Sequence, residues 1–144
     1  MKPLPLLSAL LVAATLCLAA EKKPVPGPRG GKLLENSAPR AEFFIGKDNR
    51  VTVTFYDEKL KPVPVAGQVV AVTAEPASGK VKLEMEKKGD VLVSREPLPK
   101  GEGYNIVVQV KATAEARPQN FRLKFDLHFC GECKRSEYAC TCDH

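Results

Sequence analysis

The sequence predicts an all-β protein, a single antiparallel immunoglobulin-like β-sandwich of about seven strands with a cysteine-rich hairpin at the C-terminus. Two observations predict the sandwich. Short runs of alternating apolar and polar residues recur along the chain with turn-forming residues between them. No stretch after residue 20 carries an apolar stripe of helical period over ten or more residues. A third observation, four cysteines within the last fifteen residues, predicts the hairpin.

The N-terminus has the pattern of a secretory signal peptide. Lys2 is followed by an uncharged apolar run over residues 4–18, and then by two small residues, Ala19 and Ala20. We expect cleavage near residue 20 and a periplasmic or secreted protein. The run is shorter than the roughly 18 to 20 residues that span a bilayer, so no transmembrane segment is expected after cleavage. Cys17 follows a leucine, where lipidation requires a small residue, and we expect it to leave with the signal.

Composition predicts one domain without a nucleic-acid partner. Loss of residues 1–20 from the 144-residue chain leaves 144 − 20 = 124 residues, the size of one domain. It removes one charge, Lys2, so the net charge falls from +5 to +4. This mild excess is interspersed with acidic residues, and no dense basic patch with aromatics indicates nucleic-acid binding.

The chain divides into three parts after the signal peptide. Residues 21–32 contain three prolines and three glycines and few apolar residues, which predicts a flexible or polyproline-like tether. Residues 33–129 are predicted to form the sandwich, and residues 130–144 a cysteine-rich tail. The predicted strands are residues 41–45, 50–56, 68–75, 80–86, 91–95, 104–114 and 120–129. Within the second of these, Val51, Val53 and Phe55 alternate with polar or amphipathic residues, the period that buries one face of a strand.

Tyr104 stands at the start of a predicted strand, after the turn at residues 99–103. The segment 98–110 resembles the corner of immunoglobulin-like folds, in which such a tyrosine hydrogen-bonds back across the turn. The alternative is a partly buried strand tyrosine without that bond.

Several features together resemble a family of small exported β-sandwich proteins of bacterial periplasmic metal handling, including copper-resistance sandwiches. They are the signal and tether, the sequence GGKLLEN at residues 30–36, the pair Phe43 and Phe44, and the LPxGxGY corner ending at Tyr104. The resemblance covers the sandwich but not the tail, and it implies the fold and an exported location. Some such proteins carry a histidine before the Gly-Gly pair. Arg29 stands there in this chain, so the resemblance implies no metal ligand at that position.

The last predicted strand alternates over its whole length. The residues Phe121, Leu123, Phe125, Leu127 and Phe129 are predicted to face the core, and Arg122, Lys124, Asp126, His128 and Cys130 to face solvent. His128 and Cys130 are therefore expected to be neighbours on the solvent face.

The tail carries the candidate site. Cys130 and Cys133 form a C-x-x-C turn, and Cys140 and Cys142 return to it after six residues. Four thiolates complete a tetrahedral zinc site, whereas a subset of them suits Cu(I), which favours few soft ligands. The candidate ligands are Cys130, Cys133, Cys140 and Cys142, with His128 and His144 as additional or substitute ligands. The expected partners are the metal ion and another envelope protein.

Disulfides are the alternative, because four cysteines in an exported chain often form two bridges. A bridge within Cys140-Thr-Cys142 would be strained, so each of the first two cysteines would pair with one of the last two. No catalytic motif is visible, and the C-x-x-C ends a strand rather than starting a helix, so we expect no enzyme. The working hypothesis is metal binding for buffering or delivery; its rival is a structural or protein-interaction module locked by two disulfides.

Overall fold

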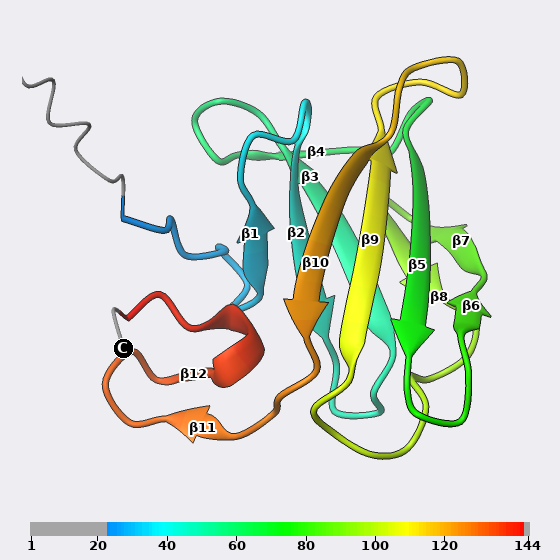
Figure 1. Cartoon of the computed structure of the whole chain (residues 1–144). Helices are drawn as coiled ribbons and strands as arrows, with labels where there is room; N and C mark the ends of the chain where they lie inside the picture. The colour runs from blue at the N-terminus through cyan, green and yellow to red at the C-terminus, as the bar shows by residue number, and fades with distance from the viewer. Residues whose placement is uncertain (1–22, 143–144) are drawn as a thin grey trace, which may run out of the picture.

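The computed structural model describes residues 23–142 as two antiparallel β-sheets packed face to face (Figure 1). The predicted signal peptide and His144 lie outside the described residues. The six-stranded sheet has the order β1 (Lys32–Leu34), β2 (Arg40–Ile45), β3 (Val51–Tyr56), β8 (Val91–Ser94) and β7 (Met85–Lys88), with β4 (Pro62–Val63) paired to β3. The four-stranded sheet has the order β10 (Gln119–Lys124), β9 (Asn105–Lys111), β5 (Val69–Glu75) and β6 (Val81–Leu83).

A third, small sheet lies at one end of the sandwich. It pairs β11 (Phe129–Cys130) with β12 (Arg135–Ser136), and a single-turn 3-10 helix, η1 (Glu137–Ala139), follows directly. The antiparallel all-β fold with a cysteine-rich C-terminal hairpin is therefore confirmed. The described residues contain twelve strands rather than about seven, because short pairing segments such as β1, β4 and β12 carry too few residues to show a period. No helix in residues 23–142 is long and apolar enough to cross a membrane.

The core lies between the two sheets, where each contributes one face of its alternating residues. Phe43, Val53 and Phe55 from the six-stranded sheet and Val72, Ile106 and Val108 from the other are completely buried. One predicted strand, residues 80–86, is divided between the sheets. It pairs with β5 as β6, passes Glu84, and then pairs with β8 as β7. The hydrophobic period continues through this transition, so periodicity alone does not show where the chain changes sheets.

Of the two alternatives for Tyr104, the structure shows the tyrosine corner. Tyr104 precedes β9, and its hydroxyl donates a 2.8 Å hydrogen bond to the carbonyl of Pro99. Burial raises the pKa of Tyr104 to about 12, so the hydroxyl keeps its proton and remains a donor. Its ring packs against Phe125 with 4.9 Å between the ring centroids. The corner thus ties the loop before β9 to the end of the strand that leads to the cysteines.

The predicted alternation of the last strand is correct only as far as Phe125. Leu123 and Phe125 are buried and alternate with the exposed Arg122 and Lys124, but β10 ends at Lys124. Phe129 is 66% exposed and Cys130 only 4% exposed, so the expectation that Phe129 faces the core and Cys130 faces solvent is wrong. The chain leaves the sheet at residues 125–128, and a break in pairing resets which side each later residue faces.

The proline- and glycine-rich segment also differs from the predicted tether. Its described part includes a β-bridge between Pro26 and Lys32, and Gly27 and Gly31 are buried. The backbone N–H groups of Arg29 and Gly31 donate to the carboxylate of Glu42, which is completely buried in β2. Composition pointed to a segment too poor in apolar residues to pack, whereas the observed docking uses backbone hydrogen bonds.

We expect Phe125→Ala to lower the free energy of unfolding by about 3 to 5 kcal/mol, because it removes a buried aromatic ring that packs on Tyr104. Lys124→Ala, one residue earlier and exposed, is expected to change it by no more than about 0.5 kcal/mol. Urea unfolding followed by circular dichroism measures both. Equal losses from the two substitutions would contradict the register of β10.

Candidate metal centre

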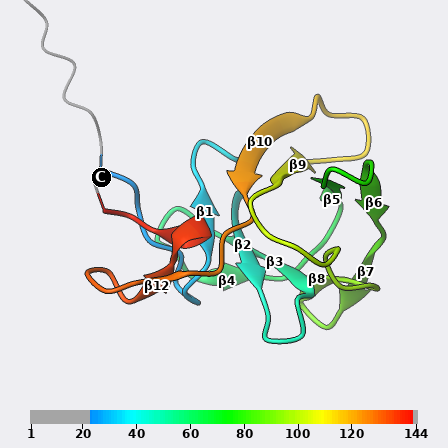
Figure 2. The same cartoon turned by 60° about the horizontal axis from the view of Figure 1, so that its bottom comes forward.

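The cysteine-rich hairpin is anchored to the sandwich by one aromatic residue. Tyr138 in η1 lies edge-on to Phe43, with 6.3 Å between ring centroids, and its hydroxyl accepts a 3.0 Å hydrogen bond from the backbone N–H of Ile45. Ala139 beside it is completely buried. Figures 1 and 2 show η1 next to β1 at the end of the sandwich. The hairpin therefore contributes to the core, which a division at residue 129 does not anticipate.

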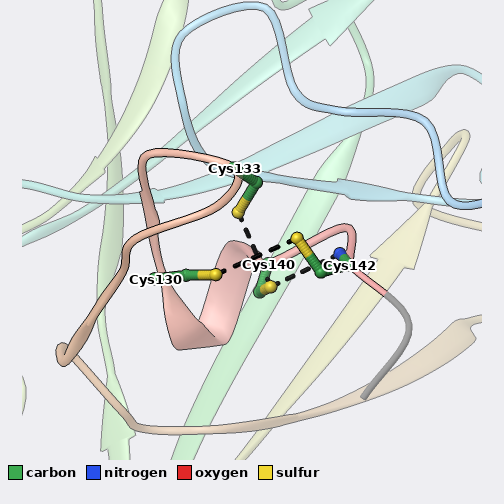
Figure 3. A group of neighbouring side chains, drawn as sticks. All are labelled: Cys130, Cys133, Cys140 and Cys142. Carbon is green, nitrogen blue, oxygen red and sulfur yellow. Dashed lines mark hydrogen bonds between the residues drawn. The ribbon is translucent and has the colours of Figure 1, made fainter.

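This anchoring brings the four cysteines together (Figure 3). Cys130 ends β11, Cys133 lies in the turn to β12, Cys140 follows η1 and Cys142 comes two residues later. All four sulfur atoms lie within 4.8 Å of one another. The Sγ–Sγ distance is 3.9 Å between Cys130 and Cys142, and 3.6 Å between Cys133 and Cys140. Both are far longer than the roughly 2.05 Å of a disulfide bond, so these cysteines are free thiols.

Backbone N–H groups surround two of the sulfurs. The amides of Cys133 and Glu132 donate to Cys130 and hold the pKa of its thiol below the ordinary value. The amide of Thr141, helped by the neighbouring thiols and the amide of Arg135, lowers the pKa of Cys133 to about 7. Hydrogen bonds of this kind stabilise thiolate, the form of cysteine that binds metal.

The other two sulfurs show the opposite shift. The amide of Cys142 donates to the Cys140 sulfur at 3.4 Å and lowers its pKa, but burial and the neighbouring thiols outweigh this, and the pKa is raised. Burial, followed by the neighbouring thiols, raises the pKa of Cys142 as well. Without a cation, the cluster therefore stabilises thiolate at Cys130 and Cys133 and disfavours it at Cys140 and Cys142. A bound cation removes this limit, because it compensates the negative charge of all four sulfurs.

The spacing of the sulfurs fits a tetrahedral ion. A Zn–S bond of about 2.3 Å places the sulfurs of a tetrahedral site about 3.8 Å apart. The separations of 3.6 and 3.9 Å are close to that edge length, and since no two of the four sulfurs are more than 4.8 Å apart, only small side-chain movements would complete the tetrahedron. The donor amides also supply the outer hydrogen bonds that orient ligands in metal sites. The four residues fit a metal ion in number, geometry and chemistry.

His128 is placed differently from the expectation. Its Nδ1 lies 2.7 Å from the carboxylate of Asp126 and 3.8 Å from that of Glu102, and its side chain is 76% exposed. The bond to Asp126 raises the pKa of His128, which favours the protonated ring over the neutral ring that binds metals. Within residues 23–142, the cluster of side-chain atoms placed to hold a metal ion contains the four cysteine sulfurs and does not include His128. His144 lies outside the described residues.

Two residues that position the site were not predicted from the sequence. Tyr138 anchors the hairpin, and Arg135 donates from Nη1 to the carbonyls of Gly27 at 3.1 Å and Gly31 at 3.4 Å. An aromatic residue in an otherwise polar cysteine-rich tail was a usable signal for Tyr138. No local pattern marks Arg135, since its partners lie more than 100 residues earlier.

Comparison with known proteins adds no relative: no protein family, curated protein or solved structure matches the chain.

In metal-free, reduced protein we expect Cys133 to be alkylated several-fold faster than Cys140 and Cys142 near pH 7. A pKa of about 7 leaves about half of this thiol ionised, against a few per cent for an ordinary cysteine. Cys142, whose pKa is raised, is expected to react most slowly. A pulse of iodoacetamide followed by peptide mass spectrometry, repeated across pH, gives the order and midpoint. Labelling of Cys142 before Cys133 would contradict these assignments.

Proposed function

We propose that this protein is an exported, non-enzymatic β-sandwich that binds one soft transition-metal ion through Cys130, Cys133, Cys140 and Cys142. The observation that carries the proposal is the gathering of four free thiols, from four positions on one short segment, within 4.8 Å. Sulfur is the preferred donor for soft metals, and two closely spaced cysteine pairs are a common way to supply four ligands. The signal-like N-terminus supports export.

Zinc is the ion that the geometry favours. All four sulfurs converge with separations near a tetrahedral edge, and closed tetrahedral Cys₄ sites hold structural zinc. Cu(I) favours fewer ligands, which would leave one or two cysteines unused. The resemblance to copper-resistance sandwiches supports the compartment and the fold more than the choice of ion, because it does not extend to the cysteine tail.

The position of the site favours a structural role for the metal over transport. Cys130 is 4% exposed, and Tyr138 and Ala139 lie in the hydrophobic core between the two cysteine pairs. Removing the metal would release ligands on both sides of that anchor. Metal delivery to an envelope protein is the second candidate, favoured by the partial exposure of Cys133, Cys140 and Cys142.

We expect the protein, purified from its own compartment under conditions that exclude oxidation, to carry one zinc per chain and no disulfide. Native mass spectrometry with elemental analysis and thiol counting measures this. Cobalt(II) added to metal-free protein should give the intense visible absorption of a tetrahedral tetrathiolate site. Cys133→Ser is expected to lower zinc affinity by more than about a hundredfold, since it removes a direct ligand.

His128→Ala is the matched control. It removes a potential ligand two residues from Cys130 and is expected to leave the zinc stoichiometry and the cobalt spectrum unchanged, because its ring bonds to Asp126. Loss of metal in this variant would make His128 a ligand. Two intrachain disulfides and no metal in the purified protein would reject the proposal in favour of a disulfide-locked module.

A further inference from the structure

The N-terminal loop, residues 27–31, is held by hydrogen bonds to two side chains, Glu42 and Arg135. On one side the carboxylate of Glu42 accepts hydrogen bonds from the N–H groups of Arg29 at 2.9 Å and Gly31 at 2.8 Å. On the other side the guanidinium of Arg135 donates to the carbonyls of Gly27 and Gly31. The loop thus presents its N–H groups to an anionic side chain and its carbonyls to a cationic one, the pairing that makes such bonds strong.

The loop fits this position closely. A Cβ atom on Gly27 would lie 2.3 Å from Oε1 of Glu42, and one on Gly31 would lie 2.4 Å from the carbonyl oxygen of Phe43. Both distances are shorter than side-chain carbons tolerate, so glycine at each position is what permits the approach. Tyr56 completes the arrangement, since its hydroxyl donates to Oε2 of Glu42 at 2.6 Å. The contact is a specific docking site for the loop.

One of these two side chains, Arg135, belongs to the cysteine hairpin. Arg135 lies two residues after Cys133, and its backbone N–H donates to the Cys133 sulfur. Lys134 between them adopts a left-handed conformation, with φ of 59°, that turns the chain sharply and starts β12. The pairing of β11 with β12 spans only two residue pairs, too few for a hairpin to persist by itself. The position of Arg135 therefore depends on the Tyr138 anchor on one side and on what holds the cysteines together on the other.

We propose that metal binding at the four cysteines fixes Arg135 and thereby holds the N-terminal loop on the sandwich, so that metal release loosens residues 25–32. This inference rests on the proposed metal site. The loop carries the bridge from Pro26 to Lys32, along β1 at the edge of the six-stranded sheet.

The test compares zinc-loaded protein with protein stripped by a chelator in the presence of a thiol-free reductant. Hydrogen exchange of the peptide covering residues 25–34 and the rate of tryptic cleavage after Arg29 and Lys32 report the loop. Both are expected to rise about tenfold on metal removal, because two charge-assisted hydrogen bonds lose their donor. Amide exchange in β9, in the middle of the core, is measured in the same samples and is expected to change much less.

Arg135→Ala removes the two hydrogen bonds from Arg135 to the loop but leaves the four candidate metal ligands in place. With zinc bound, this variant should show the faster cleavage and exchange of the stripped wild type, and stripping it should add little further. Arg117→Ala, an exposed arginine in the loop after β9, is the control and should behave as wild type. Metal content is measured in every sample, so failure to bind zinc rejects the proposed function separately from this inference.

Three results would overturn the inference. One is zinc binding at one ion per chain with no change at residues 25–34 when the metal is removed. Another is a parallel acceleration in β9, which would make the metal effect a general loss of stability. The third is unchanged cleavage and exchange in zinc-loaded Arg135→Ala, which would show that Glu42 holds the loop without help from the hairpin.

Discussion

The docking of Tyr138 on the sandwich is the contact on which the candidate metal centre depends. Its ring lies edge-on to Phe43 and its hydroxyl accepts the N–H of Ile45, so it fixes η1 against β2. Because Cys130 and Cys133 come before this anchor and Cys140 and Cys142 after it, the two pairs are turned toward each other. A chain of this length without an anchor would pay a large entropic cost to gather four side chains at one point. The sandwich therefore brings the two cysteine pairs near each other before any ion binds.

A second constraint is the buried carboxylate of Glu42. Removal of a charge from water is costly unless several donors replace the lost solvent, and here backbone amides of residues 29 and 31 and the Tyr56 hydroxyl do so. Burial and the bond to Glu42 raise the pKa of Tyr56, which keeps its donor proton in place. An unpaired carboxylate would destabilise an apolar core, but this one binds and positions a segment that has almost no apolar side chains. Arg135 connects that segment to the cysteine hairpin.

Thiol chemistry links the metal hypothesis to its disulfide rival, because both draw on the same four sulfurs. Exported proteins meet oxidising conditions, in which closely spaced thiols form disulfides unless a metal occupies them. The separations of 3.6 and 3.9 Å would bring Cys133 to Cys140 and Cys130 to Cys142 first. Under the proposed function, a metal that binds early in folding would protect the thiols and hold the hairpin, whereas nested disulfides would hold it by a different geometry.

The sequence by itself determined the all-β class, the position of most long strands and the grouping of the four cysteines, because each follows from local periodicity, turn chemistry or spacing. It placed Tyr104 at the start of a strand but left its corner hydrogen bond open, which the structure decided. Only the tertiary structure decided the exposure of Phe129, the burial of Cys130, the division of residues 80–86 between two sheets and the docking of residues 27–31 on Glu42. Each of these depends on where pairing between distant strands stops or on a partner far along the chain. Alternation records which residues of a strand face together, but it carries no information about where the strand leaves its sheet.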